Sequence, residues 1–132
     1  MKRFILPLAL FAATTLLGQQ APLTVHTDVG AHGYGQAYYT AQHVNRLRPE
    51  YIGQVSALDI ADGYTVILFD GEDGEGRDQL TITGPQRIED LKTQVRLHGS
   101  GNWDNAIRSL VLFQSNAGIE QIAPSEIAAN PN

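Results

Sequence analysis

A pattern that occurs twice constrains the fold of this chain more than any other feature. A ring residue is followed after six residues by a glycine, and His26 begins the first copy and Phe69 the second. Each copy follows an apolar strand-like run, and another strand-like run comes later, at 55–60 and again at 107–112. A repeat of this kind fixes the architecture, because each copy is one supersecondary unit. We therefore expect one all-β domain made of two similar four-strand motifs.

The start of the chain is typical of a secretory signal peptide. Two basic residues precede a mostly apolar run at 4–17, and Gly18 is a small residue at a plausible cleavage point. The run is shorter than the ~20 residues that a membrane-spanning helix needs. We therefore expect residues 1–18 to be removed and the protein to be secreted, periplasmic or extracellular, with no membrane contact after cleavage.

The remaining chain has the length of a single domain. We expect this domain at 19–114, with motif one at about 23–62 and motif two at about 63–114. Residues 115–132 are rich in Ala, Asn, Pro and Ser and are expected to form a loose C-terminal tail. The chain has no cysteine, so export would bring no disulfide bonds.

The charge of the chain is acidic. Nine Lys and Arg stand against fourteen Asp and Glu, and loss of the signal peptide would change the net charge from −5 to −7. A nucleic-acid binder normally carries the opposite sign, so no nucleic-acid partner is expected. Five of the acids crowd into 70–78, a run that is usually a solvated turn but that also attracts cations.

Three further expectations concern the structure of short segments. Residues 40–47 are interpreted as one or two helical turns with Val44 and Leu47 turned inward, and 87–95 as a mixed stretch with a short helix. Tyr38 and Tyr39 are neighbours in a strand, so one of them should be exposed.

At this point the residues resemble a known family, the βγ-crystallin domains of the microbial, secreted type. The likeness covers 23–114 and is carried by the two hairpins, the linker 62–64 and the two later strands. The segment 103–110, with sequence WDNAIRSL, is also similar to the calcium loop of the family, [N/D]-[N/D]-x-x-[S/T]-S.

The resemblance implies two Greek-key motifs that form a sandwich of two four-stranded sheets. It also implies two calcium sites at one end, each shared between the motifs. A hydroxyl from one loop, an acidic or amide side chain from the other, and backbone carbonyls would surround the ion. Calcium takes six to eight oxygen ligands of these kinds.

The first motif departs from the family pattern. Its ring position is His26, for which we expect a packed ring in an aromatic slot. The first loop has Ile52 and Gly53 where the family has acids or amides, and neither side chain offers an oxygen. Ser56 does occupy the hydroxyl position.

In the second loop Asp104 and Asn105 match, but Arg108 occupies the hydroxyl position. A guanidinium has no acceptor and repels calcium, and it could instead pair with Asp104. If the loops exchange ligands, one site would use Ser56, Asp104 and Asn105, with a hairpin carbonyl near Glu72, whereas the other site would be lost. We expect at most one weak calcium site and no other cofactor.

Arg108→Ser would distinguish the two causes of that loss. A gain in calcium affinity would identify Arg108 as the block, and no gain would identify Ile52 and Gly53 as the limiting defect.

Other kinds of site are disfavoured. The acidic run at 70–78 fails as an EF-hand, since the twelfth residue from Asp70 is Thr81 and no helices flank the run. The four histidines lack the spacing of zinc ligands. No Gly-x-Ser-x-Gly elbow occurs, and the carboxylates are bunched in one turn, so we do not expect an enzyme.

Two functions remain as hypotheses. The first is a secreted, non-enzymatic domain with a structural or calcium-modulated role. The alternative is a binding module or a protease inhibitor of crystallin-like fold, and the sequence does not identify a protein or glycan partner.

Overall fold

The computed structural model describes residues 20–99 and 101–116. The expected signal peptide and residues 117–132 of the expected tail therefore lie outside the described residues. Ser115, the first residue of that tail, is held to the sandwich, because its amide donates to the carbonyl of Gly63 at 2.9 Å.

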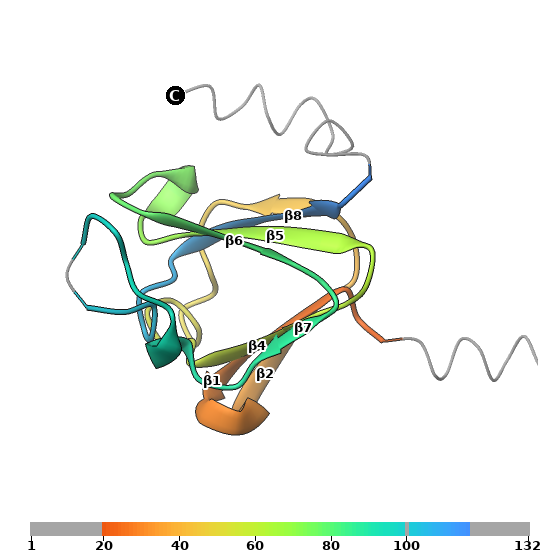
Figure 1. Ribbon diagram of the computed structural model, residues 1–132, viewed down its shortest axis with the longest axis horizontal. Coiled ribbons are helices and arrows are strands. Elements are labelled where there is room, and N and C mark those ends of the chain that lie inside the picture. The colour runs from red at the N-terminus through yellow and green to blue at the C-terminus, as the bar shows by residue number, and fades with distance from the viewer. Residues whose placement is uncertain (1–19, 100, 117–132) are drawn as a thin grey trace, which may run out of the picture.

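The described residues form two four-stranded sheets that pack face to face (Figure 1). The order in the first sheet is β2 (His32–Tyr38), β1 (Leu23–Asp28), β4 (Ala57–Ile60) and β7 (Gln86–Ile88). The order in the second sheet is β3 (Gln42–Val44), β8 (Ser109–Gln114), β5 (Tyr64–Phe69) and β6 (Gln79–Thr83). All six neighbouring pairs are antiparallel, so the predicted all-β, two-sheet sandwich is confirmed.

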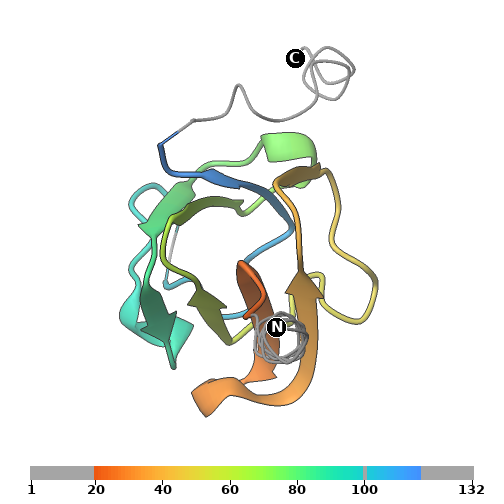
Figure 2. The same cartoon turned by 90° about the vertical axis from the view of Figure 1, so that its right-hand side faces the viewer.

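Each motif exchanges one strand with the other. Motif one places β1, β2 and β4 in the first sheet, but its β3 pairs with β8 of motif two. Motif two places β5, β6 and β8 in the second sheet, but its β7 pairs with β4 of motif one. In a view at right angles, the red β1 lies below the blue β8, so the two sheets are seen as separate layers (Figure 2). This exchange is the Greek-key connection that the family resemblance implied.

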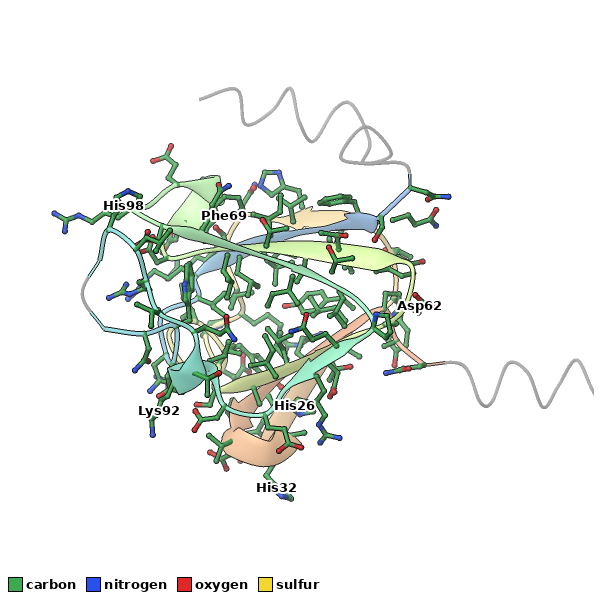
Figure 3. The ribbon with its side chains drawn as sticks, in the orientation of Figure 1. His26, His32, Asp62, Phe69, Lys92 and His98 are labelled. Carbon is green, nitrogen blue, oxygen red and sulfur yellow. The ribbon has the colours of Figure 1, made fainter. Side chains whose placement is uncertain are left out.

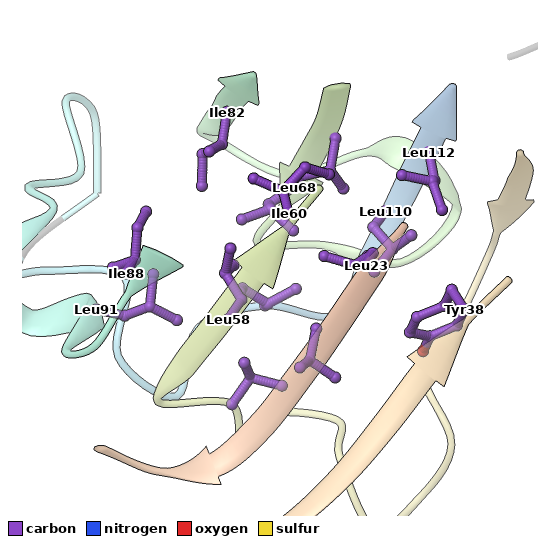
Figure 4. Close-up of a cluster of buried hydrophobic side chains, with 14 of the residues drawn as sticks. Leu23, Tyr38, Leu58, Ile60, Leu68, Ile82, Ile88, Leu91, Leu110 and Leu112 are labelled. Atoms are coloured by element: carbon purple, nitrogen blue, oxygen red, sulfur yellow. The ribbon is translucent and has the colours of Figure 1, made fainter. Parts of the chain in front are cut away.

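The core fills the space between the sheets (Figure 4). Its side chains come from the inward positions of both sheets, since alternate residues of a strand face the same side. Leu58, Leu68 and Leu110 are fully buried, and Trp103 from the long connection before β8 is only 1% exposed. Tyr38 is buried and Tyr39 is 71% exposed, which confirms that one of this pair faces solvent.

The helical prediction for residues 40–47 is wrong. Residues 42–44 are the edge strand β3, in which Val44 pairs with Leu110 of β8. The hydrogen-bonding partner of this short segment lies far away in sequence, so tertiary pairing overrides its local preference. Leu47 is nevertheless buried, as expected.

The stretch 87–95 was predicted to contain a short helix, and it contains a single 3₁₀ turn. β7 ends at Ile88, and the turn η4 (Leu91–Thr93) follows, with the Asp90 carboxylate accepting from the amide of Lys92 at 3.0 Å. The side chain of Leu91 is buried and fixes this turn against the core.

Candidate calcium site

The two loops of the expected calcium sites run side by side in opposite directions. The amide of Gly53 donates to the carbonyl of Ile107 at 3.1 Å, and the amide of Asn105 donates to the carbonyl of Val55 at 3.0 Å. Gly53 and Asn105 are equivalent in the two loops, and both have left-handed backbones, with φ of +68° and +61°. The hydrogen bonds are therefore related by a local two-fold axis between the motifs.

The ring positions of the repeat obey the same relation. The carbonyl of His26 accepts from the amide of Ser56 at 2.8 Å, and the carbonyl of Phe69 accepts from the amide of Arg108 at 2.9 Å. His26 and Phe69 therefore occupy equivalent places in two similar halves, as the sequence repeat predicted. Each ring position fixes the fifth position of its own motif's loop.

The loop pairing brings three of the four predicted ligands to one end, which we call the first end. The Asn105–Val55 hydrogen bond sets Asp104 and Asn105 beside Ser56, the residue that follows Val55. Ser56 is 8% exposed. The Oδ1 atom of Asp104 is buried and has no hydrogen-bond partner. A buried carboxylate oxygen without a partner is costly, so it favours a cation beside it.

The fourth predicted ligand, Glu72, lies by a different loop end. It follows Phe69 in the second hairpin, and its carboxylate lies 3.5 Å from Nε of Arg46. The same hairpin is fixed to β8, because the hydroxyl of Ser109 donates to the carbonyl of Gly71 at 2.6 Å. These contacts place Glu72 on the side of Arg108, whereas the two-fold relation places Val29 of the first hairpin on the side of Ser56.

The other end of the loop pair, which we call the second end, does not fit a cation. Ile52 and Gly53 supply no side-chain oxygen there, and Arg108 replaces the hydroxyl. A Cβ atom built on Gly53 would lie 3.9 Å from Nη2 of Arg108, so the guanidinium lies over the start of the first loop. Arg46 pairs with Glu72. The cationic side chain of Arg108 therefore lies where the family pattern implies an ion.

The hypothesis that Arg108 pairs with Asp104 is wrong. No ion pair joins them in the part of the chain that the structure describes, and Oδ1 of Asp104 is without a hydrogen bond. The physical reason is the antiparallel course of the loops, which puts residues 104 and 108 at opposite ends of the pairing.

His26 fills the ring position of the first motif on the outer face of β1 (Figure 3). Its Nε2 lies 3.2 Å from Oδ2 of Asp59, and its side chain is 14% exposed. A Cβ atom on Gly35 would lie 3.3 Å from the imidazole, so the ring packs against the glycine backbone of β2. Asp59 also lies 3.5 Å from Nε of Arg87. The imidazole is thus packed, as expected for this slot.

A second group of buried polar contacts lies at the base of the second hairpin and was not predicted from the sequence. Asp78 accepts from the amides of His98 and Gly99 and lies 2.9 Å from Nδ1 of His98. Burial raises the pKa of the Asp78 carboxyl, but the two amides and the His98 ring together outweigh burial, and the net pKa is lowered. Asp70 pairs with Arg96 at 3.2 Å. Only the excess of acids at 70–78 hinted at these contacts.

Two further observations limit the kinds of site. Within 20–99 and 101–116, no three or more His, Cys, Asp or Glu side chains are grouped so as to hold a metal. An ion at the first end would therefore depend on hydroxyl, amide and carbonyl oxygens in addition to Asp104. The same residues include no helix with the length and apolarity to cross a membrane.

We compared the chain with known protein families, curated proteins and solved structures. No protein-family model and no curated protein matches the chain. A domain solved in work on the evolution of the eye-lens βγ-crystallin fold matches with a TM-score of 0.61 and 16% identity, over 74% of this chain and 91% of that one. A βγ-crystallin domain from Flavobacterium johnsoniae matches with a TM-score of 0.57 and 19% identity, over 73% and 98%. An archaeal βγ-crystallin matches with a TM-score of 0.55 and 17% identity, over 72% and 100%. The chain therefore has the βγ-crystallin fold.

Proposed function

We propose that this protein is a secreted, non-enzymatic βγ-crystallin-type domain that binds one calcium ion weakly at the first end. Ser56, Asp104 and Asn105 would supply the side-chain oxygens, and backbone carbonyls would complete the set. Bound calcium would stabilise the fold, because the separated loops of an unfolded chain cannot form the site.

The observation that carries this proposal is the buried Oδ1 of Asp104, which has no hydrogen-bond partner. In the calcium-free protein this oxygen has lost its hydration without compensation. A hard cation beside it, held also by the Ser56 hydroxyl and the Asn105 amide oxygen, would remove that penalty. The second end offers no comparable oxygen.

The expected stabilisation is small. Extracellular calcium modules with few charged ligands bind with a Kd of about 10⁻⁴ to 10⁻³ M. At ~1 mM calcium, such a site adds about 0.4 to 1.4 kcal/mol to the free energy of unfolding. For a domain of this size, that raises Tm by roughly 2 to 11 °C.

Thermal melting and isothermal titration with calcium test the proposal. Wild type should bind one ion and melt at a higher temperature with calcium than with magnesium, which dehydrates less readily. Asp104→Ala should abolish this response. It should also raise the Tm of the calcium-free protein, because it removes a buried, unpartnered carboxylate oxygen.

Asp62→Ala is the matched control. It removes an exposed carboxylate in the linker at the opposite end of the domain (Figure 3). This variant should retain the calcium response of wild type. The proposal fails if titration shows no binding at millimolar calcium, or if Asp104→Ala binds calcium as wild type does.

Secretion rests on the basic start and the apolar run at 4–17. Expression of the full chain in a bacterial host, followed by N-terminal sequencing of the exported protein, tests it. A mature N-terminus near residue 19 is expected. Recovery of the intact chain in the cytoplasmic fraction alone would contradict it.

A further inference from the structure

The dipeptide Asp-Gly occurs three times in the chain, at 62–63, 70–71 and 73–74. The backbone nitrogen that follows an aspartate can attack the side-chain carboxyl and close a five-membered succinimide ring. A following glycine favours this attack, because it has no Cβ atom and leaves the backbone free to turn. All three copies have this same local chemistry, so their surroundings in the fold decide which of them reacts.

The reaction needs only water. The glycine nitrogen bonds to Cγ of the aspartate, and the amide proton and the carboxyl OH leave together as one water. Water then adds to one of the two ring carbonyls. Addition at Cγ breaks the new bond and restores aspartate, whereas addition at the main-chain carbonyl breaks the original peptide bond and leaves isoaspartate. A reactive site therefore needs an accessible carboxyl, an amide without a hydrogen bond and a peptide that can rotate.

The first copy, Asp62–Gly63, meets all three requirements. Asp62 is exposed, and among the described residues neither its carbonyl nor the amide of Gly63 has a hydrogen-bond partner. The turn is held instead by the amide of Tyr64, which donates to the carbonyl of Ala61 at 3.3 Å. A turn can keep this hydrogen bond while its central peptide rotates, as types I and II show. A Cβ atom built on Gly63 would meet nothing within 4 Å, so there is room for the rotation.

The second copy, Asp70–Gly71, is blocked by packing. The side chain of Asp70 is only 7% exposed, and its carboxylate lies 3.2 Å from Nη1 of Arg96 and accepts from the amide of Asp78 at 3.2 Å. A Cβ atom built on Gly76 would lie 2.6 Å from the nitrogen of Gly71 and 3.1 Å from the main-chain carbonyl carbon of Asp70. The backbone at Gly76 therefore covers this peptide and prevents it from rotating.

The third copy, Asp73–Gly74, is blocked by hydrogen bonds. The amide of Gly74, which would be the nucleophile, donates to the hydroxyl of the fully buried Ser109 at 3.0 Å. The amide of Asp73 donates to the carbonyl of Asn45 at 2.7 Å, so the backbone is fixed on both sides of the aspartate. Ring closure would break the hydrogen bond to Ser109, and the third copy should react only when the hairpin opens locally.

We propose that Asp62 is a site of spontaneous modification, which converts to isoaspartate through a succinimide while the protein is folded. The fold protects Asp70 and Asp73 from the same reaction. This inference does not depend on the calcium site, because Asp62 lies at the opposite end of the domain (Figure 3).

Isoaspartate at position 62 lengthens the main chain by one carbon between the two motifs. The change falls just before β5, which begins at Tyr64, and beside the carbonyl of Gly63, which accepts from the amide of Ser115 at 2.9 Å. These groups cannot all keep their positions when the linker is longer. The modified protein should therefore be less stable than the unmodified protein.

Ageing of the purified protein at neutral pH and physiological temperature tests the proposal. Electron-transfer fragmentation of its peptides locates isoaspartate, and the succinimide appears as a peptide lighter by one water. Isoaspartate should form about tenfold or more faster at Asp62 than at Asp70 or Asp73, because the protected sites must first open. In concentrated urea the three rates should become similar. The proposal is overturned if Asp62 reacts no faster than the others in the folded protein, or if its advantage persists in urea.

Two variants test the assignment of the sites. Asp62→Glu would need a six-membered ring, so methyl transfer by a purified isoaspartyl methyltransferase should fall to the level expected from Asp70 and Asp73. Unchanged methyl transfer would overturn the proposal. Ser109→Ala frees the amide of Gly74 and should speed the reaction at Asp73 but not at Asp62, and no increase at Asp73 would refute the protection assigned to Ser109. Thermal melting shows whether each variant is folded during ageing.

The effect on stability is measured on the separated products. The isoaspartyl fraction of wild type should melt at a lower temperature than the unmodified fraction. Aged Asp62→Glu is the matched control and should keep its original Tm. Equal Tm values for the two wild-type fractions would overturn the consequence drawn for the linker.

Discussion

Ser56 and Arg108 occupy the same position in the two halves of the domain, and each donates its amide to the carbonyl of its own motif's ring residue. One is a small hydroxyl and the other an extended cation. The backbone is symmetric at this point, but the chemistry is not. One end of the loop pair can therefore offer oxygens to an ion, while the other already holds positive charge.

The first prediction concerns rebuilding the second end. Arg108→Ser alone should leave the calcium stoichiometry unchanged, because Ile52 and Gly53 still supply no side-chain oxygen. The combined variant Ile52→Asp, Gly53→Asn and Arg108→Ser should gain a second site, measured by isothermal titration. The left-handed backbone at residue 53 suits asparagine, which already adopts it at Asn105. A second binding event in Arg108→Ser alone would identify the guanidinium as the sole block.

The second prediction concerns acid stability. The pKa of Asp78 is lowered in the fold, so ionised Asp78 contributes stability above its unfolded pKa of about 3.9. This contribution is lost as pH falls through the folded pKa. The difference in unfolding free energy between wild type and Asp78→Asn should be constant near neutral pH and shrink below about pH 4. Urea unfolding at several pH values measures it.

The third prediction concerns alkaline stability. Burial, and then the neighbouring Tyr51, raise the pKa of Tyr38 to about 12, and Arg48 lowers it to a lesser degree. Stability from neutral Tyr38 is complete below the unfolded pKa of about 10 and is lost as pH rises through the folded value. Ultraviolet titration should show one tyrosine that ionises last, and this step should be absent in Tyr38→Phe.

The fourth prediction concerns Trp103, which is 1% exposed. Its amide donates to the carbonyl of Gln94, and its carbonyl accepts from the amide of Ala106 in the second calcium loop. Trp103→Ala should reduce the free energy of unfolding by about 3 to 5 kcal/mol, because it leaves a large cavity. Trp103→Phe should lose much less. Denaturant unfolding followed by circular dichroism compares the two, and equal losses would show that ring volume is not what matters.

The sequence predicted the two similar motifs and the two-sheet fold, and the grouping of Ser56 with Asp104 and Asn105 as calcium ligands stays a prediction. These features depend on the spacing of residues within each motif, which can be read directly from the sequence. The strand β3 was missed because its pairing with β8 is set by residues nearly 70 positions away. Glu72 was assigned to the wrong side of the loop pair by the same kind of error, since strand exchange decides which hairpin faces which loop end.

The contacts of Asp78 could not be predicted for a different reason. Asp78 accepts hydrogen bonds from the backbone amides of His98 and Gly99. Nearly every residue type has a backbone amide, so the residue types at these positions do not indicate the contact. The second motif has fourteen positions from Leu91 to Asn105 where the first has six from Leu47 to Gly53. This difference becomes visible only when Leu47 and Leu91 are known to be equivalent, since their amides donate to the carbonyls of Arg108 and Ser56. That equivalence comes from hydrogen bonds across the two-fold axis and not from similarity between the segments.

The exchange of β3 and β7 makes each half of the molecule unable to complete its own sheet. A chain cut in the linker at residues 62–63 would yield two fragments, each missing the edge strand that the other holds. Such fragments should stay unfolded alone and reassemble when mixed. The domain consequently behaves as an intramolecular dimer, whose linker converts an association that depends on concentration into a single cooperative folding event.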